Sequence, residues 1–215
     1  MQDTHLTAIE PGTAMLAANE LFCERDDRIL FQRLSFAVAE GQVLQVRGSN
    51  GSGKTTLLRI VCGLNDSYEG DLTWYGAPLA EQVEHFRHEL LYIGHRVGVN
   101  KVLTPLENLR WTCGLSARVD DDAILQALAA MGLRGFEYSQ CFTLSAGQQQ
   151  RVSLARLLLS PARLWILDEP FTTLDKHGVA QLEFLLAEHA AKGGAVLVTT
   201  HHELHVPELE ELELG

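Results

Sequence analysis

Residues 48–55 read Gly-Ser-Asn-Gly-Ser-Gly-Lys-Thr, which is a complete phosphate-binding P-loop pattern, G-x-x-x-x-G-K-[ST]. The five residues before it, 43–47, favour a β-strand, and residues 56–62 have apolar spacing compatible with a helix. A P-loop connects a strand to a helix, so this context supports the motif and predicts an α/β fold with a parallel sheet that binds a nucleotide.

The loop offers several kinds of phosphate ligand. Its glycines can adopt positive φ angles, and its backbone N–H groups, with the helix N-terminus, form a nest for an anion. We expect Lys54 to reach the β- and γ-phosphates and Thr55 to bind Mg²⁺, whereas Asn50 and Ser52 should only shape the loop tip. The predicted nucleotide-binding residues of this segment are Gly48, Ser49, Asn50, Gly51, Ser52, Gly53, Lys54, Thr55 and Thr56.

A second motif places two carboxylates after a buried strand. Residues 164–170 read Leu-Trp-Ile-Leu-Asp-Glu-Pro, and the apolar run is typical of a parallel-sheet strand that is buried on both faces. Asp168 should emerge at the carboxyl edge of the sheet and hold Mg²⁺ as a Walker-B carboxylate. Alternation along the strand points Glu169 away from Asp168, toward the water that attacks the γ-phosphate. The alternative is a solvated acidic turn.

Residues 144–149 read Leu-Ser-Ala-Gly-Gln-Gln, and they resemble the signature motif of ATP-binding cassette (ABC) proteins. The resemblance to this family covers nearly the whole chain after about residue 15. It implies a P-loop NTPase (RecA-like) parallel core, an antiparallel β lobe and an inserted helical subdomain. It also implies a homodimer, because the family's signature binds the γ-phosphate held by the opposite subunit. The matching signature residues are Ser145, Ala146, Gly147 and Gln148, heading a helix expected over 148–159.

The resemblance extends to two elements beyond the Walker-B strand. Residues 172–175 resemble the family's aspartate segment, and residues 196–201 end in a histidine that matches its switch histidine, which contacts the γ-phosphate. His202 and His205 are interpreted as surface residues, and a metal site made with His201 is an alternative that no other ligand cluster supports. The expected catalytic residues are therefore Lys54, Glu169 and His201.

The chain departs from the family pattern at two positions. Where the family has a glutamine, residues 91–95 end in His95, which we expect near Mg²⁺-bound water together with Thr55 and Asp168. A plain surface histidine is the alternative. Where the family commonly stacks an aromatic ring on adenine, Arg25 is the expected residue, because a guanidinium plane can stack on a base. Phe22 is the alternative.

Four strings narrow the resemblance: Leu-Phe-Cys-Glu-Arg-Asp (21–26), Ile-Gly-His (93–95), Leu-Thr-Pro-Leu-Glu-Asn-Leu (103–109) and Ala-Gly-Gln-Gln-Gln-Arg (146–151). They are similar to the ATP-binding subunits of cytochrome c maturation, also called haem exporter ATP-binding proteins. This resemblance implies a peripheral subunit at the cytoplasmic face of the inner membrane that pairs with small integral membrane subunits. Its ATP hydrolysis would serve haem export or the release of a haem-loaded chaperone. An ABC subunit for another cargo is the alternative.

Net charge and chain-wide patterns argue against several other classes of protein. The net charge of −11 argues against nucleic acid as a partner, and a single signature without a long insertion argues against an ABC protein acting on ribosomes. No run approaches the length of a transmembrane helix, and no signal peptide is present. The cysteines lack metal or redox spacing and are interpreted as reduced thiols in or near the core. They are Cys23, Cys62, Cys113 and Cys141.

The chain is expected to form one domain over residues 15–215, preceded by a disordered extension over residues 1–14. Residues 15–40 and 70–80 should form the antiparallel lobe around adenine. The parallel core should come from 41–69 and 160–201, and the helical subdomain from about 96–159. The acidic tail, 203–215, has alternating leucines and is either an amphipathic segment packed on the core or a solvated terminus.

Overall fold

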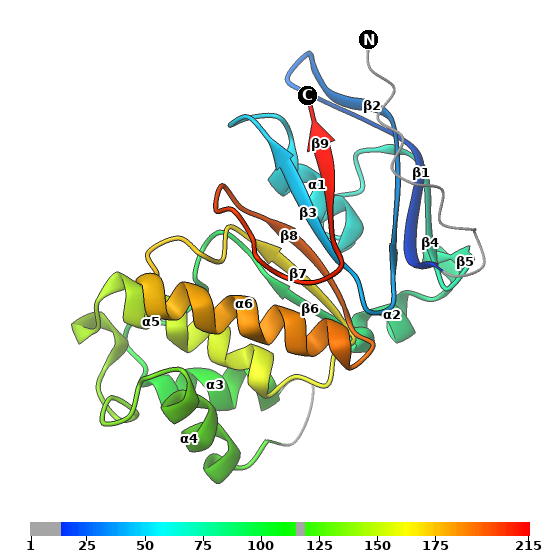
Figure 1. The fold of residues 1–215 in the computed structure, drawn as a ribbon. Helices are drawn as coiled ribbons and strands as arrows, with labels where there is room; N and C mark the ends of the chain where they lie inside the picture. Colours follow the sequence, from blue (N-terminus) through cyan, green and yellow to red (C-terminus); the bar gives the residue numbers. More distant parts are fainter. Residues whose placement is uncertain (1–13, 115–118) are drawn as a thin grey trace.

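A parallel sheet forms the centre of the computed structural model, which describes residues 14–114 and 119–215 (Figure 1). Its strand order is β6-β7-β8-β3-β9, and every neighbouring pair is parallel. Residues 1–13, nearly all of the expected extension, lie outside the described part. The strands are β3 (Val43–Gly48), β6 (Leu90–Ile93), β7 (Leu164–Asp168), β8 (Ala195–Thr199) and β9 (Leu209–Leu214).

A separate antiparallel sheet has the order β2-β1-β4-β5 and matches the predicted β lobe. The long strands β1 and β2 are joined by Asp26 and Asp27, whose φ angles of 52° and 59° suit a tight hairpin turn. Its strands are β1 (Ala14–Arg25), β2 (Arg28–Ala39), β4 (Glu69–Trp74) and β5 (Ala77–Pro78). Helix α2 (Val83–Glu89) follows this sheet and leads into β6.

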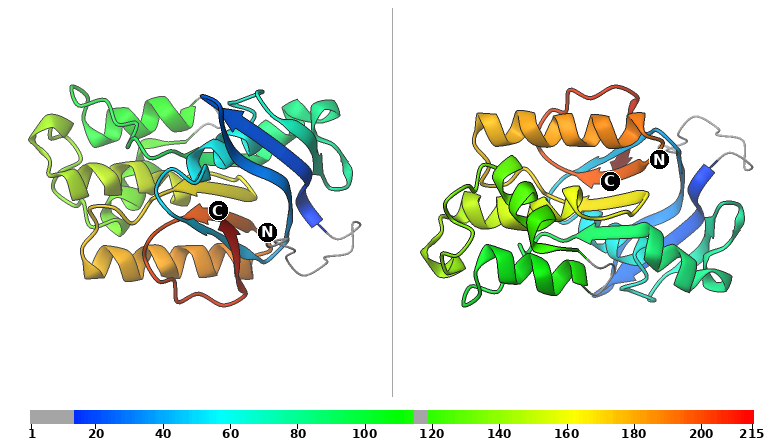
Figure 2. Two further views of the ribbon diagram at one scale, coloured as in Figure 1. Left: turned by 90° about the horizontal axis from the view of Figure 1, so that it is seen from above. Right: turned by 90° about the horizontal axis from the view of Figure 1, so that it is seen from below.

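The other helices lie mainly in and around the expected helical subdomain. In Figure 1, α3, α4 and α5 gather on one side of the parallel sheet and the antiparallel sheet lies on the other. Figure 2 shows α6 running alongside the strands of the parallel sheet. The helices are α1 (Lys54–Val61), α3 (Pro105–Gly114), α4 (Asp121–Ala130), α5 (Ala146–Leu154), which continues as a 3₁₀ turn over Ala155–Leu158, and α6 (Lys176–Ala191).

Side-chain alternation along the parallel strands divides the core into two clusters. On β7, Trp165 and Leu167 pack with the helical subdomain and α6, whereas Leu164 and Ile166 pack with α1 and the antiparallel sheet. All five residues of β7 are buried, as expected for a strand covered on both faces. The carboxyl ends of the strands are therefore held between two packed layers. This packing positions the residues that follow each strand.

The acidic tail packs on the core, and it does so as a strand. Residues Leu209–Leu214 form β9, which pairs with β3 along its whole length and buries Leu212 and Leu214. The alternative of a solvated terminus is therefore wrong. Strand β9 also reaches the P-loop: a Cβ on Gly48, whose φ is 139°, would collide with the carbonyl oxygen of Leu214. Only glycine fits at this position.

The predicted state of the cysteines is confirmed, since all four are free thiols and buried. Within the described residues, no helix is both long and apolar enough to cross a membrane.

Candidate nucleotide site

The P-loop joins the end of β3 to the start of α1, as the sequence predicts. Its three glycines, Gly48, Gly51 and Gly53, all have positive φ angles, of 139°, 83° and 103°. Gly53 is also the N-cap of α1 and carries no side chain that could occupy the space in front of the helix. The backbone of the loop and the N-terminus of α1 can therefore contact the same anion.

Lys54 folds its side chain back over the loop. Its Nζ donates to the carbonyl oxygens of Gly48, at 2.7 Å, and Ser49, at 3.1 Å, and the residue is buried. The ammonium group thus lies beside the loop that would hold the phosphates. Ser52, which the sequence suggested only shapes the loop, is buried, and its hydroxyl has no hydrogen-bond partner among the described residues.

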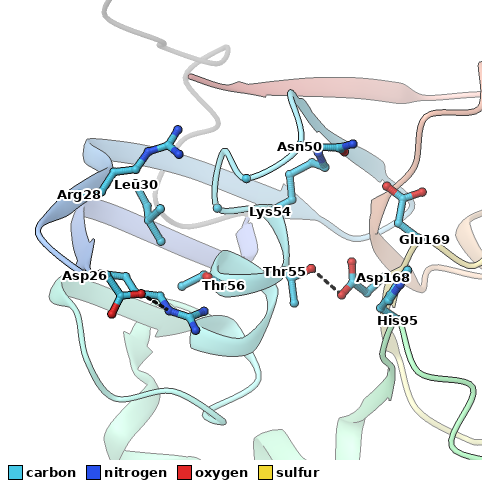
Figure 3. A pocket seen from close by; sticks show the side chains of 13 residues that line it. Asp26, Arg28, Leu30, Asn50, Lys54, Thr55, Thr56, His95, Asp168 and Glu169 are labelled. Carbon is cyan, nitrogen blue, oxygen red and sulfur yellow. Dashed lines mark hydrogen bonds and ion pairs between the residues drawn. The ribbon is translucent and has the colours of Figure 1, made fainter.

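Asp168 is placed to share a cation with Thr55. The Thr55 hydroxyl donates to Asp168 Oδ2 at 2.9 Å, and the Thr199 hydroxyl donates to Asp168 Oδ1 at 2.7 Å. Asp168 is only 2% exposed, so these two hydroxyl groups supply hydrogen bonds that its buried carboxylate requires. Two hard oxygen donors, one hydroxyl and one carboxylate, therefore lie side by side at the carboxyl end of β7 (Figure 3).

Glu169 leaves the strand by a sharp change of backbone direction. Its φ is 52°, and its N–H donates to both the carbonyl and the hydroxyl oxygen of Thr199, each at 3.0 Å. The side chain reaches His201, whose Nε2 lies 3.6 Å from Glu169 Oε1 and 3.1 Å from Asn50 Oδ1. Asn50 therefore contacts the predicted switch histidine and does more than shape the loop.

The P-loop, Asp168 and Glu169 border one cavity of about 500 Å³, which we call the nucleotide cavity. Its size is that of a typical small-molecule site. Figure 3 shows its side chains coming from the β1–β2 hairpin, the P-loop, α1 and the ends of β6 and β7. The lining consists of Arg25, Asp26, Arg28, Leu30, Asn50, Gly51, Gly53, Lys54, Thr55, Thr56, His95, Asp168 and Glu169. Four predicted site residues are not part of this lining: Gly48, Ser49, Ser52 and His201.

His95 and Arg25 both lie on this cavity. His95 is exposed and shares the lining with Thr55 and Asp168, in the place expected for a group near the metal's water. Arg25 is also exposed. Its Nε lies 3.4 Å from Asp26 Oδ2, at the end of the β1–β2 hairpin. Phe22, the alternative for adenine, is not part of the lining.

Arg28 and Leu30 are lining residues that the sequence did not suggest. Arg28 pairs with Arg25 across the β1–β2 hairpin, and Leu30 lies two residues further along the same strand. The Asp-Asp turn at 26–27 is the one local signal that places these strand ends together.

The signature residues lie in a separate hollow of about 660 Å³, which we call the signature hollow. Ser145 starts α5 with a capping box: its hydroxyl accepts from Gln148 N at 3.2 Å, and Gln148 Oε1 accepts from Ser145 N at 2.9 Å. A Cβ on Gly147 would come within 2.8 Å of the Thr173 carbonyl oxygen. The hollow shares no residue with the nucleotide cavity. It is lined by Gly132, Ser145, Ala146, Gly147, Gln148, Arg151, Thr173 and Asp175.

The aspartate segment is tied to the signature helix. Arg151 Nη2 lies 2.6 Å from Asp175 Oδ1, and the same carboxylate caps α6 by accepting from Gly178 N at 2.8 Å. The hydrogen bond from the Gly178 N–H lowers the pKa of Asp175 below its ordinary value, and the positive charge of Arg151 lowers this pKa further. The carboxylate is thus held ionised between α5 and α6.

His202 is half-buried, so its interpretation as a surface residue is wrong, whereas His205 is exposed. Both imidazoles face Glu183 of α6, with nitrogen–oxygen distances of 3.3 Å and 3.6 Å. Over residues 14–114 and 119–215, no three His, Cys, Asp or Glu side chains form a group that could hold a metal ion. The alternative of a histidine metal site is therefore not supported.

Comparison with solved structures gives the same fold. The dimeric structure of MJ0796, a bacterial ABC transporter cassette, superposes with a TM-score of 0.79 at 23% identity, covering 93% of this chain and 94% of that one. A post-hydrolysis dimer of the same cassette bound to ADP and Pi gives a TM-score of 0.75 at 23% identity, covering 87% and 88%. At this identity the likeness establishes the fold alone.

Sequence comparison establishes the family. The ABC transporter family model matches residues 31–172. The cytochrome c biogenesis ATP-binding export protein CcmA of Hahella chejuensis is 53% identical, covering 94% of this chain and 97% of that protein. The protein of the same name from Pseudomonas fluorescens is 55% identical, covering 86% and 87%. The chain therefore belongs to the ABC transporter family, within its group of cytochrome c biogenesis ATP-binding export proteins.

Proposed function

We propose that this chain is the ATP-hydrolysing subunit of a membrane ABC complex that serves cytochrome c biogenesis. The observation that carries the proposal is the convergence of Lys54, Asp168 and Glu169 on one cavity at the P-loop. The relatives named for cytochrome c biogenesis support the biological role, because the match extends over 97% of one of them.

The donors around the P-loop fit a nucleotide triphosphate. The backbone N–H groups of the loop and the Lys54 ammonium are donors, and Gly51, Gly53 and Lys54 line the same cavity. Among the residues lining the cavity, Arg25 at the hairpin end is the proposed contact with adenine.

The Thr55 hydroxyl and the Asp168 carboxylate are hard oxygen donors, and they fit Mg²⁺, which keeps several water ligands of its own. His95 would hydrogen-bond to one of these waters. When bound, the ion would neutralise charge on the β- and γ-phosphates.

Hydrolysis follows from the arrangement of the protein's own groups. Glu169 orients the attacking water and accepts its proton, while Lys54 and the loop N–H groups stabilise the charge on the γ-phosphate oxygens. His201, which lies 3.6 Å from Glu169, donates a hydrogen bond to the γ-phosphate.

A second copy of the chain completes each site. The signature hollow shares no residue with the nucleotide cavity, so Ser145 and Gly147 would serve the ATP of the partner. The dimer would close on ATP and open after hydrolysis. His95 and residues 96–101 would contact the small integral membrane subunits and transmit this movement to them. The outcome of this cycle would be haem export or release of a haem-loaded chaperone. An ABC complex with another cargo is the second candidate, because other polypeptides build the cargo path.

A membrane pull-down tests this proposal. Glu169→Gln removes the base and should trap an ATP-bound dimer, so the tagged variant is held with ATP and Mg²⁺, solubilised gently and analysed by mass spectrometry. We expect small integral membrane proteins together with a haem-carrying chaperone. A conventional permease without any haem-handling protein would remove the haem assignment but leave the ATPase mechanism. Lys54→Ala in the same background is the control, since it should lose tight ATP binding and with it the trapped complex.

A further inference from the structure

Strand β3 contains a buried polar side chain between two apolar ones. Gln45 is 2% exposed and lies between Leu44 and Val46, which are fully buried. A buried amide costs free energy unless its hydrogen bonds are satisfied, so the contacts of Gln45 show what such a residue does in the core.

The amide of Gln45 holds the backbone on both sides of His201. Its Nε2 donates to the carbonyl oxygen of Thr200 at 3.2 Å and to that of His202 at 3.3 Å. Because both partners are carbonyl oxygens, only the nitrogen of the amide can face them. One side chain therefore fixes the carbonyl groups that precede and follow the switch histidine.

The same segment, residues 200–205, which we call the switch loop, is held at two further points. The Thr200 hydroxyl accepts from His202 N at 2.9 Å, and Glu183 Oε1 on α6 accepts from His205 N at 3.0 Å. In contrast, the imidazole of His201 is 61% exposed and lies beside Asn50 and Glu169, two residues that line the nucleotide cavity. The backbone of the loop is thus fixed while its functional side chain remains available to a ligand.

Gln45 also belongs to the strand that begins the P-loop. Only Val46 and Arg47 separate it from Gly48, and β8, which leads into the switch loop, is the neighbour of β3. The distance between the phosphate cradle and His201 is therefore set across two adjacent strands by this amide.

We propose that Gln45 is a positioning residue for His201: it sets the switch loop relative to the P-loop so that the imidazole meets the γ-phosphate. The inference rests on the proposed ATPase function. It makes Gln45 important for turnover and unimportant for nucleotide affinity, because the side-chain hydrogen bonds of Gln45 go to the switch loop and Gln45 is not part of the cavity lining. Small displacements of a positioned group can cost about 100-fold in rate.

The test is a double-mutant cycle in the intact membrane complex, with kcat, KM for ATP and ATP affinity measured for each variant. Gln45→Met keeps the length of the side chain and removes its donor. We expect kcat to fall at least about tenfold, with ATP affinity within about twofold, and no further loss when Gln45→Met is added to His201→Ala. An equal loss in both backgrounds, or an unchanged kcat, would overturn the inference.

Two further variants keep the test informative. Gln42→Met is the matched control, because Gln42 is also buried but its Oε1 accepts from Ala39 N, at the opposite end of β3. It should leave kcat unchanged. If Gln45→Met does not fold, Gln45→Leu serves instead, since it also lacks the donor and is apolar like its neighbours on β3, and the same dependence on His201 is expected. A His201→Ala complex with full turnover would contradict the proposed mechanism itself, which is a separate result from a failed cycle.

Discussion

At the scale of single residues, the site depends on two adjacent carboxylates in opposite environments. Asp168 is buried and accepts hydrogen bonds from two hydroxyl groups, whereas Glu169 is turned out of the strand by a φ of 52° and faces His201. A non-glycine residue pays about 1 kcal/mol or more for such a conformation, and the two hydrogen bonds from Glu169 N to Thr199 hold it. The turn would separate the proposed cation ligand, Asp168, from the proposed base, Glu169.

Gly147→Ala should separate ATP binding from ATP turnover. The added methyl group would come within 2.8 Å of the Thr173 carbonyl oxygen, so the start of α5 must move. We expect ATP affinity of the monomer to be unchanged and turnover to fall at least about tenfold, because the displaced donors belong to the partner's site. Equilibrium binding of a fluorescent ATP analogue and steady-state hydrolysis measure the two quantities.

Gly114→Ala is the matched control for this prediction, since a Cβ at the end of α3 would meet no atom of residues 14–114 or 119–215 within 4 Å. Weaker ATP binding by the Gly147→Ala monomer would show that the signature hollow and the nucleotide cavity are not independent.

The placement of a contiguous motif could be predicted, because the P-loop fixes its own geometry through glycines and a helix start. The position of Arg28 and Leu30 in the lining of the nucleotide cavity could not be predicted. It depends on the pairing of two strands, for which the sequence gives little local signal. The half-burial of His202 was also missed. It arises from packing against Glu183 and Phe171, which lie on segments that the local pattern around His202 does not identify.

At the scale of elements, β9 changes the environment of the P-loop strand. Without it, β3 would be the edge of the parallel sheet and would expose unpaired backbone groups. The alternation of glutamate and leucine over residues 211–214 has the period of a strand, but the partner of a parallel strand lies far away in sequence and is not encoded locally. This is why the tail was expected only to pack or to be solvated.

Leu212→Ala should destabilise the fold through this element. Leu212 is fully buried, and truncating such a leucine typically costs about 2–5 kcal/mol. The denaturant midpoint should fall accordingly, while Glu213→Ala, on the exposed face of the same strand, should leave the midpoint nearly unchanged. Equal midpoints for the two variants would mean that β9 contributes no packing to the core.

The end of α6 gives the fold a dependence on pH. His189 stacks on Trp165 at 3.7 Å between ring centroids, and burial lowers the pKa of its imidazole below the ordinary value of 6.5. The unfolded chain therefore binds this proton more readily. The stabilisation from neutral His189 is complete above about pH 6.5 and is lost as the pH falls through the lowered pKa.

Urea unfolding between pH 5 and pH 8, values roughly 1.5 units on either side of the ordinary imidazole pKa, measures the effect. His189→Gln should make the free energy of unfolding depend less on pH below neutrality. His88→Gln, at an exposed position on α2, should retain the wild-type slope. A slope that is the same in all three proteins would contradict the assignment to His189.

At the scale of the whole molecule, the proposed dimer would make the nucleotide cavity and the signature hollow halves of two different sites. A mixture of two inactive variants should therefore regain activity. A dimer of one Lys54→Ala chain and one Gly147→Ala chain has one site with both defects and one with neither. With random exchange, about a quarter of all sites would be intact.

The measurement is ATP turnover after mixing, compared with each variant alone. Mixing Lys54→Ala with the double variant Lys54→Ala/Gly147→Ala is the control, because every site then lacks Lys54. Turnover of the first mixture that equals the sum of its separate components would argue that each chain hydrolyses ATP by itself.

The position of β3 in the sheet has a consequence for how the protein is made. Its two neighbours, β8 and β9, begin at Ala195 and Leu209, so the P-loop strand is synthesised long before either partner exists. During most of translation the apolar residues of β3 have no strand to pair with, and closing such distant contacts is slow. The nucleotide site is therefore assembled among the last events of folding, although its defining loop is among the first segments to leave the ribosome.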